Sequence, residues 1–211
     1  MFDLLLLEDF LDPPARDAVL ADVRAAAGAA APVHGIGRTG VAPRVRHATQ
    51  LEVSEAIRGL IDRRLTDLKP ALTERFGVAL SGHEPPQFLR YETGGFFVAH
   101  QDGNTPVIRD RTLDRRISIV IFLNTQTPEP DSEPLAGSYT GGELVFHASY
   151  PNIGTRQTVA GAAGSLLAFR SETTHEVTMV TGGERYTIFR PEREQRSCTA
   201  DHRLACADVR I

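Results

Sequence analysis

The segment that decides the fold is RYETGGFFVAHQD, residues 90–102. An apolar run, Phe96–Ala99, follows two glycines and predicts a short strand. His100 and Asp102 come directly after it, and the one-residue gap places both side chains on the same side of an extended backbone. An imidazole and a carboxylate are ligands that a divalent transition metal takes. The segment therefore predicts a strand that ends in a candidate metal site.

Strand character continues on the C-terminal side of this run. Gly, Pro and Asn clusters separate short extended segments, with no helical pattern between them. We expect a closed or rolled β architecture with the earlier helices packed outside it. About eight strands are predicted here: Gln87–Tyr91, Phe96–Ala99, Arg116–Leu123, Glu143–His147, Thr155–Val159, Ser165–Phe169, Glu176–Val180 and Arg185–Arg190.

The N-terminal part, after a short strand at Phe2–Leu7, reads as mostly helical. One helix is expected from the Asp12-Pro13-Pro14 start to about Ala27, and residues 29–40 are expected to be a loop. Ser54 is the expected N-cap of a second helix with apolar residues at helical spacing. Pro70 is expected to end or kink this helix near Lys69, with a further turn before Gly77.

Length and composition bound the class of protein. The chain has 211 residues and a net charge of −4, which fits one soluble globular domain and argues against a nucleic-acid partner. The longest apolar run is too short to span a bilayer, so no membrane partner is expected. The N-terminus lacks the basic segment of a secretory signal, and both cysteines lie near the C-terminus. A cytoplasmic location is expected.

Domain limits follow from the same patterns. Residues 1–191 are expected to form a single domain, with 1–82 as helical support and 83–191 as its β-rich part. The polar residues 192–211 read as a C-terminal tail. Two long loops, Thr105–Arg116 and Thr125–Gly141, are candidate lids.

Further residues complete a candidate site. His175 precedes a predicted strand, and two neutral imidazoles with one carboxylate form the facial triad that suits non-haem Fe(II). A His-x-Asp pair alone is more often a surface pair. Arg185 would share a strand face with Thr187 and Phe189, and if that face looks inward it is a buried cation that needs an anion. Tyr91 could donate a hydroxyl to the same anion.

These residues resemble those of the prolyl 4-hydroxylase-like 2-oxoglutarate/Fe(II)-dependent dioxygenases. Residues 90–102 follow that family's order of Tyr, Gly, an aromatic and His-x-Asp. The resemblance covers residues 1 to about 191 and continues in four further segments: LEDFL at 7–11, GGEL at 141–144, GSLLAF at 164–169 and THEV at 174–177.

The resemblance implies a mostly β fold with flanking helices (α+β), in which residues 83–191 form a double-stranded β-helix (jelly roll) packed against N-terminal helices. It implies that His100, Asp102 and His175 bind Fe(II) and that Arg185 and Tyr91 anchor 2-oxoglutarate. Prolyl 4-hydroxylases proper usually carry Lys at the Arg185 position, but a guanidinium can also bind a carboxylate in a two-pronged way.

The reaction implied by the resemblance uses O2 and converts 2-oxoglutarate to succinate and CO2, with ascorbate as a candidate reductant. The substrate would be a peptidyl prolyl residue, an amino acid or a small metabolite. The bound metal would carry a charge of about +1, so the distal carboxylate of 2-oxoglutarate needs its own cation.

Two other functions stay open. One is a jelly-roll binding or sensor protein that keeps the site without turnover. The other is a cupin-type metalloenzyme that does not use 2-oxoglutarate, which would leave Arg185 and Tyr91 without a purpose.

Several other residues have alternative interpretations. The C-terminal Cys198, His202 and Cys206 are spaced by four residues. They are either metal ligands or part of a loose or disulfide-prone tail. The charged segment that contains Arg115 either borders the mouth of the site or is a solvated loop. Four further histidines are expected at the surface or in structural roles: His34, His47, His83 and His147. Six phenylalanines are assigned to the core: Phe88, Phe96, Phe97, Phe122, Phe146 and Phe169.

Overall fold

The computed structural model describes residues 2–35, 38–103, 111–127, 136–149 and 152–194. The larger of its two main sheets is antiparallel throughout, and β7 (Leu80–His83) pairs with the C-terminal end of its central strand. Its strands, in spatial order, are β1 (Leu4–Leu7), β14 (Leu166–Arg170), β10 (Arg115–Phe122), β17 (Arg185–Glu194), β8 (Gln87–Tyr91), β6 (Thr49–Leu51) and β2 (Gly28–Ala30).

The smaller main sheet carries the His-x-Asp segment. It is also antiparallel, in the order β13 (Arg156–Val159), β12 (Leu144–His147), β15 (His175–Val177), β9 (Phe96–His100) and β5 (Arg46–His47). Two short pairs flank the sheets, β11 (Tyr139–Gly141) with β16 (Val180–Gly183) and β3 (Val33–Gly35) with β4 (Arg38–Gly40). A 3-10 turn, η1 (Arg111–Asp114), leads into β10.

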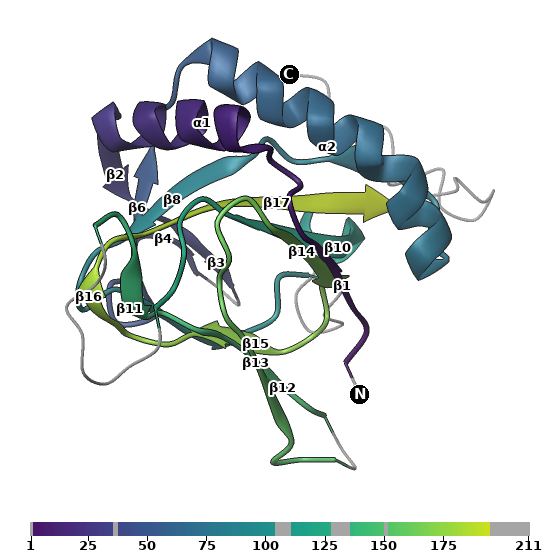
Figure 1. Cartoon of the computed structure of the whole chain (residues 1–211). Helices are drawn as coiled ribbons and strands as arrows, with labels where there is room; N and C mark the ends of the chain where they lie inside the picture. The colour runs from purple at the N-terminus through teal and green to yellow at the C-terminus, as the bar shows by residue number, and fades with distance from the viewer. Residues whose placement is uncertain (1, 36–37, 104–110, 128–135, 150–151, 195–211) are drawn as a thin grey trace.

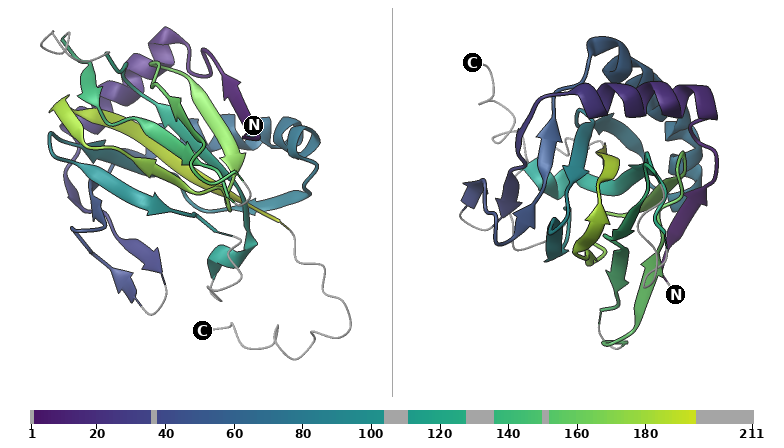
Figure 2. Two further views of the ribbon diagram at one scale, coloured as in Figure 1. Left: turned by 90° about the horizontal axis from the view of Figure 1, so that it is seen from below. Right: turned by 60° about the vertical axis from the view of Figure 1, so that its left-hand side comes forward.

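Both helices, α1 (Pro13–Ala25) and α2 (Glu55–Phe76), lie over the outer face of the larger sheet (Figure 1). The views in Figure 2 show the same order of layers: helices, larger sheet, smaller sheet. The side chains of Asp12 and Ser54 accept hydrogen bonds from Ala15 N and Ile57 N, as helix N-caps do. Gly77 ends α2 in the left-handed conformation, at φ 64°.

The expected break of α2 at Pro70 is wrong, because the helix continues to Phe76. Leu72 and Phe76 lie in the last turns of the helix and are buried in the core. Burying two such side chains contributes about 1.5–3 kcal/mol each, which offsets the roughly 3 kcal/mol cost of an interior proline. Packing therefore decides where this helix ends.

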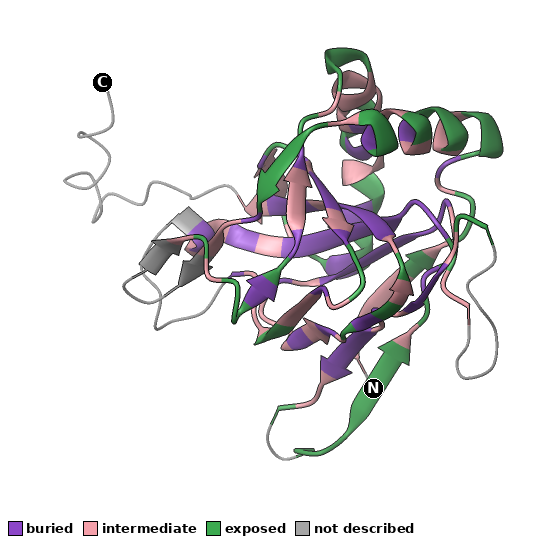
Figure 3. Ribbon diagram, turned by 90° about the vertical axis from the view of Figure 1, so that its left-hand side faces the viewer, coloured by how far each residue is buried: buried purple, intermediate pink, exposed green. Residues whose placement is uncertain are grey.

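Alternation along the central strands builds two separate cores. Ile117, Ile119 and Ile121 of β10 face the helices, whereas Val120 and Phe122 face the smaller sheet. The same split on β14 and β17 gives one core under the helices and one between the sheets. Figure 3 shows the buried residues concentrated in these central strands, with β13 exposed. The predicted mostly β fold with helices outside is confirmed.

The C-terminal half of β17 is tied to the helix layer by ion pairs. Arg190, fully buried on the helix side, pairs with Asp62 of α2 at 2.8 Å and with the equally buried Glu192. Lys69 of α2 also reaches Glu192, at 3.2 Å. Because buried charges are stable only when paired, these contacts fix the position of β17 against α2.

Some sequence expectations differ from the structure or fall outside it. Residues 29–40 were expected to be a loop, yet they include strands β3 and β4 and part of β2, formed by pairing with neighbours that no local pattern reveals. The single strand expected at 176–180 is divided between β15 and β16. Residues 105–110 of one candidate lid, residues 128–135 of the other, and the tail from 195 with its cysteines lie outside the described residues.

Neither helix in the described part of the chain combines the length and apolar character needed to cross a lipid bilayer.

Candidate active site

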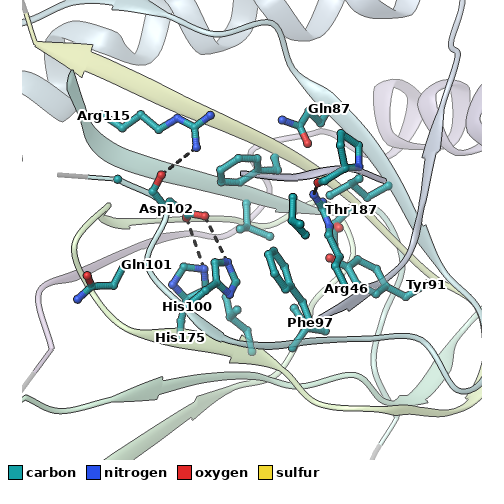
Figure 4. A pocket seen from close by; sticks show the side chains of 18 of the residues that line it. Arg46, Gln87, Tyr91, Phe97, His100, Gln101, Asp102, Arg115, His175 and Thr187 are labelled. Carbon is teal, nitrogen blue, oxygen red and sulfur yellow. Dashed lines mark hydrogen bonds and ion pairs between the residues drawn. The ribbon is translucent and has the colours of Figure 1, made fainter. Parts of the chain in front are cut away.

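Three side chains converge between the two sheets. His100 is the last residue of β9, and its register partner on β15 is His175, the first residue of that strand. Asp102 lies two residues beyond β9, and its two carboxylate oxygens lie 3.4 Å from His100 Nε2 and 3.4 Å from His175 Nε2. One ligand atom from each residue lies within 4.8 Å of the others (Figure 4). The structure brings the predicted triad together.

Backbone carbonyls fix the orientation of both imidazoles. His100 Nδ1 donates to Val98 O at 2.8 Å, and His175 Nδ1 donates to Thr173 O at 2.9 Å. A carbonyl only accepts, so the proton of each neutral ring lies on Nδ1 and the Nε2 lone pair faces the cluster. Burial lowers the pKa of His175 to about 4, which keeps this ring neutral near neutral pH. This is the protonation state of a metal ligand.

The charge state of Asp102 completes the donor set. Burial raises the pKa of its carboxyl, but His175 and His100 outweigh burial and hold that pKa well below its usual range. Its Oδ2 is buried and has no hydrogen-bond partner. Two imidazole nitrogens and a carboxylate oxygen thus present lone pairs to one point with no donor between them. A divalent cation such as Fe(II) satisfies all three, so the residues fit the metal.

A second layer of contacts positions Asp102. Its backbone N–H donates to Ser171 O at 2.9 Å, and its carbonyl accepts from Arg115 Nη1 at 2.8 Å. Glu84 holds Arg115 from the other side by two hydrogen bonds, at 2.8 and 2.6 Å. Arg193 also donates to Glu84, at 2.6 Å. The segment after β9 is therefore fixed to β10 and β17 of the larger sheet.

A cavity with about 860 Å3 of empty space, open solvent included, extends from the triad between the sheets. Arg185 and Tyr91 line it and are 1% and 2% exposed. The guanidinium carbon of Arg185 lies 5.1 Å from the Tyr91 ring centre, and its Nη1 donates to Thr187 Oγ1 at 3.3 Å. Arg185 forms no ion pair with any of the described residues. The expected burial of this cation is confirmed.

Sequence reasoning missed several residues of the site. Phe97 was assigned to the core, but it lines the cavity and stacks on His100 with ring centres 3.6 Å apart. Arg46, on a two-residue strand, also lines the cavity, and no sequence signal marked it. Arg115 appeared only within a charged segment, and Glu84 was not considered. Local pattern could not find these residues because they meet only through strand pairing.

Three further described histidines, His47, His83 and His147, are not members of the triad. His47 is exposed, as expected, whereas His83 is partly buried between Lys69 and Asp62, so its expected solvent-facing position is wrong in part. His147 ends β12 and pairs with Glu176 at 3.0 Å.

Comparison with solved structures identifies the fold. A prolyl-4-hydroxylase of Pseudomonas putida superposes with a TM-score of 0.66 at 22% identity, covering 92% of this chain and 94% of that one. HygX of Streptomyces hygroscopicus, solved with nickel and 2-oxoglutarate bound, gives 0.60 at 14% identity over 96% and 90%. The expected jelly-roll fold is confirmed by these neighbours.

Curated relatives are similar to about half of the chain. A PKHD-type hydroxylase of Shewanella sp. strain MR-7 is 37% identical over 105 residues, or 50% of this chain and 41% of that protein. One from Paracoccus denitrificans is 35% identical over 107 residues, again 50% and 41%. The match thus spans about two fifths of the length of these relatives.

The family model that matches the chain is that of the 2OG-Fe(II) oxygenase superfamily, over residues 86–190. This range contains the triad and both Tyr91 and Arg185. The superfamily uses Fe(II) and 2-oxoglutarate, the metal and co-substrate that the sequence predicted. The chain belongs to the 2OG-Fe(II) oxygenase superfamily.

Proposed function

We propose that this protein is an Fe(II)- and 2-oxoglutarate-dependent hydroxylase. The observation that carries the proposal is one cavity lined by the Asp102 carboxylate of the triad and by the buried Arg185 guanidinium, which has no ion-pair partner among the described residues. A metal cation meets the first and an anion meets the second. 2-Oxoglutarate supplies that anion and two further oxygen ligands for the metal, so one molecule joins both parts of the site.

Each group has a defined task in this proposal. His100, Asp102 and His175 would hold Fe(II) through two imidazole nitrogens and one carboxylate oxygen. Arg185 binds the distal carboxylate of 2-oxoglutarate, while the hydroxyls of Thr187 and Tyr91 are available to hydrogen-bond it. Fe(II) bound here would activate O2 for the decarboxylation of 2-oxoglutarate to succinate and CO2 and for hydroxylation of the substrate.

Apolar side chains make up much of the remaining lining, beside polar ones such as Arg46 and Gln87, and limit the access of water to the reacting groups. The apolar side chains include Leu89, Val120, Leu144, Val177 and Phe189. Removing water strengthens the charge interactions of Arg185 and protects the oxidant from solvent. This lining suits a reaction in which oxidising power must be directed to a bound substrate.

The substrate classes considered from the sequence were a peptidyl prolyl residue, an amino acid and a small metabolite, with O2 as co-substrate. Among the structural neighbours, a prolyl hydroxylase from Trichoplax adhaerens was solved with a peptide fragment, at 18% identity and a TM-score of 0.66 over 92% of this chain and 84% of that one. The single-domain boundary at 191 and the cytoplasmic location stay predictions from the sequence.

Succinate formation tests the proposal. Purified protein is incubated with Fe(II), ascorbate and 2-oxoglutarate without added substrate, and succinate is quantified by mass spectrometry. The wild type is expected to form succinate and the Asp102→Ala variant is not. Binding of 2-oxoglutarate without any succinate would support a non-catalytic sensor instead. Metal binding without 2-oxoglutarate binding would support the cupin-type alternative.

A further inference from the structure

A second buried cation lines the same cavity. Arg46 of β5 is 8% exposed, and its strand pairs with β9, which places it opposite Phe97. Its Nη1 donates to Pro32 O at 3.0 Å, and its guanidinium carbon lies 4.9 Å from the centre of the Phe97 ring. Figure 4 shows Phe97 between the two histidines and Arg46. The guanidinium is thus held on the opposite side of Phe97 from the candidate metal.

Within the described ranges, this cation has no counterion. Arg46 Nε is buried without a hydrogen-bond partner, and no carboxylate in the described ranges forms an ion pair with Arg46. The buried Arg115 and Arg190 differ, because each pairs with a carboxylate, Glu84 or Glu192. A buried cation without an anion is costly, so its retention at a cavity wall indicates that a ligand supplies the anion.

The sum of formal charges indicates that Arg185 and Arg46 need different anions. Fe(II) with Asp102 carries about +1, and Arg185 adds another positive charge. A 2-oxoglutarate dianion balances these two and leaves Arg46 unbalanced. One more negative charge is therefore required to balance Arg46 when the metal and 2-oxoglutarate are both bound.

We propose that Arg46 binds the carboxylate of the substrate, and that the substrate is a small carboxylic acid such as a free amino acid. This inference rests on the proposed function. The backbone of an internal peptide residue brings only neutral amides to this position and leaves the guanidinium without its counterion. A carboxylate on a guanidinium fork forms two charge-assisted hydrogen bonds and is held in one orientation.

The stacking order defines where the rest of the substrate lies. The Phe97 ring is nearly parallel to the His100 ring, at an interplanar angle of 18°. The guanidinium carbon of Arg46 lies over the same Phe97 ring, 4.9 Å from its centre. A substrate bound by its carboxylate at Arg46 would extend past Phe97 toward the metal. The geometry therefore favours a short acid, whose oxidised carbon lies within a few bonds of its carboxylate.

Calorimetry can test this inference without turnover. Protein loaded with Mn(II) and 2-oxoglutarate under anaerobic conditions is titrated with the free proteinogenic amino acids, and each ligand found is repeated as its carboxamide. The wild type is expected to bind an acid about tenfold or more tightly than its amide. Arg46→Gln should lower the affinity for the acid about tenfold or more and remove the preference for acid over amide. Arg46→Lys should restore part of that preference.

Controls separate this inference from the proposed function. Arg58, which lies over the Phe88 ring outside the cavity, provides the matched variant Arg58→Gln, expected to bind like the wild type. Arg46→Gln should leave the 2-oxoglutarate affinity within about threefold, whereas Arg185→Gln should lower it. Failure of the Mn(II)-loaded wild type to bind 2-oxoglutarate would refute the proposed function itself.

Three outcomes would overturn the inference while 2-oxoglutarate binding is intact. They are equal affinity for acid and amide, unchanged acid affinity in Arg46→Gln, and no binding of any acid in the panel. Turnover of a peptide blocked at both ends, with kcat/KM unaffected by Arg46→Gln, would likewise assign the cavity to a peptide.

Discussion

Arg115 donates a hydrogen bond to the backbone carbonyl of Asp102 at 2.8 Å, so a side chain of the larger sheet positions the carboxylate ligand of the smaller one. Glu84 fixes Arg115 by accepting two hydrogen bonds from its guanidinium. Gly103 leaves the space for this contact, because a Cβ there would lie 2.6 Å from Arg115 Cβ. The metal site therefore depends on residues that are not ligands.

Replacing Arg115 tests this dependence. Arg115→Gln should weaken Mn(II) binding about tenfold or more, the usual cost of losing a group that orients a metal ligand. Arg116→Gln is the matched control, since Arg116 is the next residue of the same strand, is partly exposed and pairs with Glu194. Equal metal affinities for the two variants, measured by calorimetry, would assign Arg115 a purely structural role.

The ligands themselves should be separable from folding. His100→Ala, Asp102→Ala and His175→Ala should each lose Mn(II) and Fe(II) binding while keeping the circular dichroism spectrum of the wild type, because none of the three residues is a member of either apolar core. His147→Ala, at the surface end of β12, should bind metal normally. Near-normal 2-oxoglutarate turnover by His175→Ala would disprove the triad.

Arg185 should control the affinity for 2-oxoglutarate. Losing one partner of a buried charge pair costs on the order of 2–5 kcal/mol, so Arg185→Ala should raise the KM for 2-oxoglutarate about thirtyfold or more. Arg185→Lys should recover part of the loss, since it keeps the charge but not the fork. Metal affinity measured without co-substrate should change little, because Arg185 is not a ligand. An unchanged KM in Arg185→Ala would make the cation structural.

Tyr91 should contribute less than Arg185 to the same affinity. Tyr91→Phe removes one hydroxyl and keeps the ring against the guanidinium, so the expected cost is about 0.5–1.5 kcal/mol, or up to roughly tenfold in the dissociation constant of 2-oxoglutarate. A loss as large as that of Arg185→Ala would instead show that the hydroxyl is a principal anchor.

Glu84 should make the stability of the fold depend on pH. Burial raises the pKa of its carboxyl, but the hydrogen bonds and charges of Arg115 and Arg193 outweigh burial and lower that pKa. A carboxyl with a lowered folded-state pKa contributes stability above its unfolded pKa of about 4.3, and loses it as pH falls through the folded value. Glu84→Gln should be less stable near neutral pH by about 1.5–3 kcal/mol in urea unfolding.

The same urea series should show the two proteins converging as pH falls from about 4.3 toward the lowered folded-state pKa of Glu84, because the unfolded chain takes up the proton first. A difference in unfolding free energy that stays constant from neutral to acid pH would show that the charge of Glu84 does not stabilise the fold.

The sequence predicted those parts of the site that depend on local alternation. Thr187 and Phe189 face the cavity with Arg185 because the period of a strand is two, and the same period in β8 places Leu89 beside Tyr91. Arg46 could not be found this way, because a two-residue strand has no period and its role arises from pairing with β9. The continuation of α2 past Pro70 likewise depends on core packing, which propensity does not contain.

The most direct test of the central claim is calorimetric titration of 2-oxoglutarate into the wild type, with and without Mn(II), under anaerobic conditions. The site described here predicts one binding event per chain that requires the metal, because one carboxylate and the keto oxygen bind at the triad while Arg185 holds the other end. Asp102→Ala should abolish this metal dependence. Binding that is equal with and without Mn(II), or absent from the metal-loaded wild type, would contradict the account.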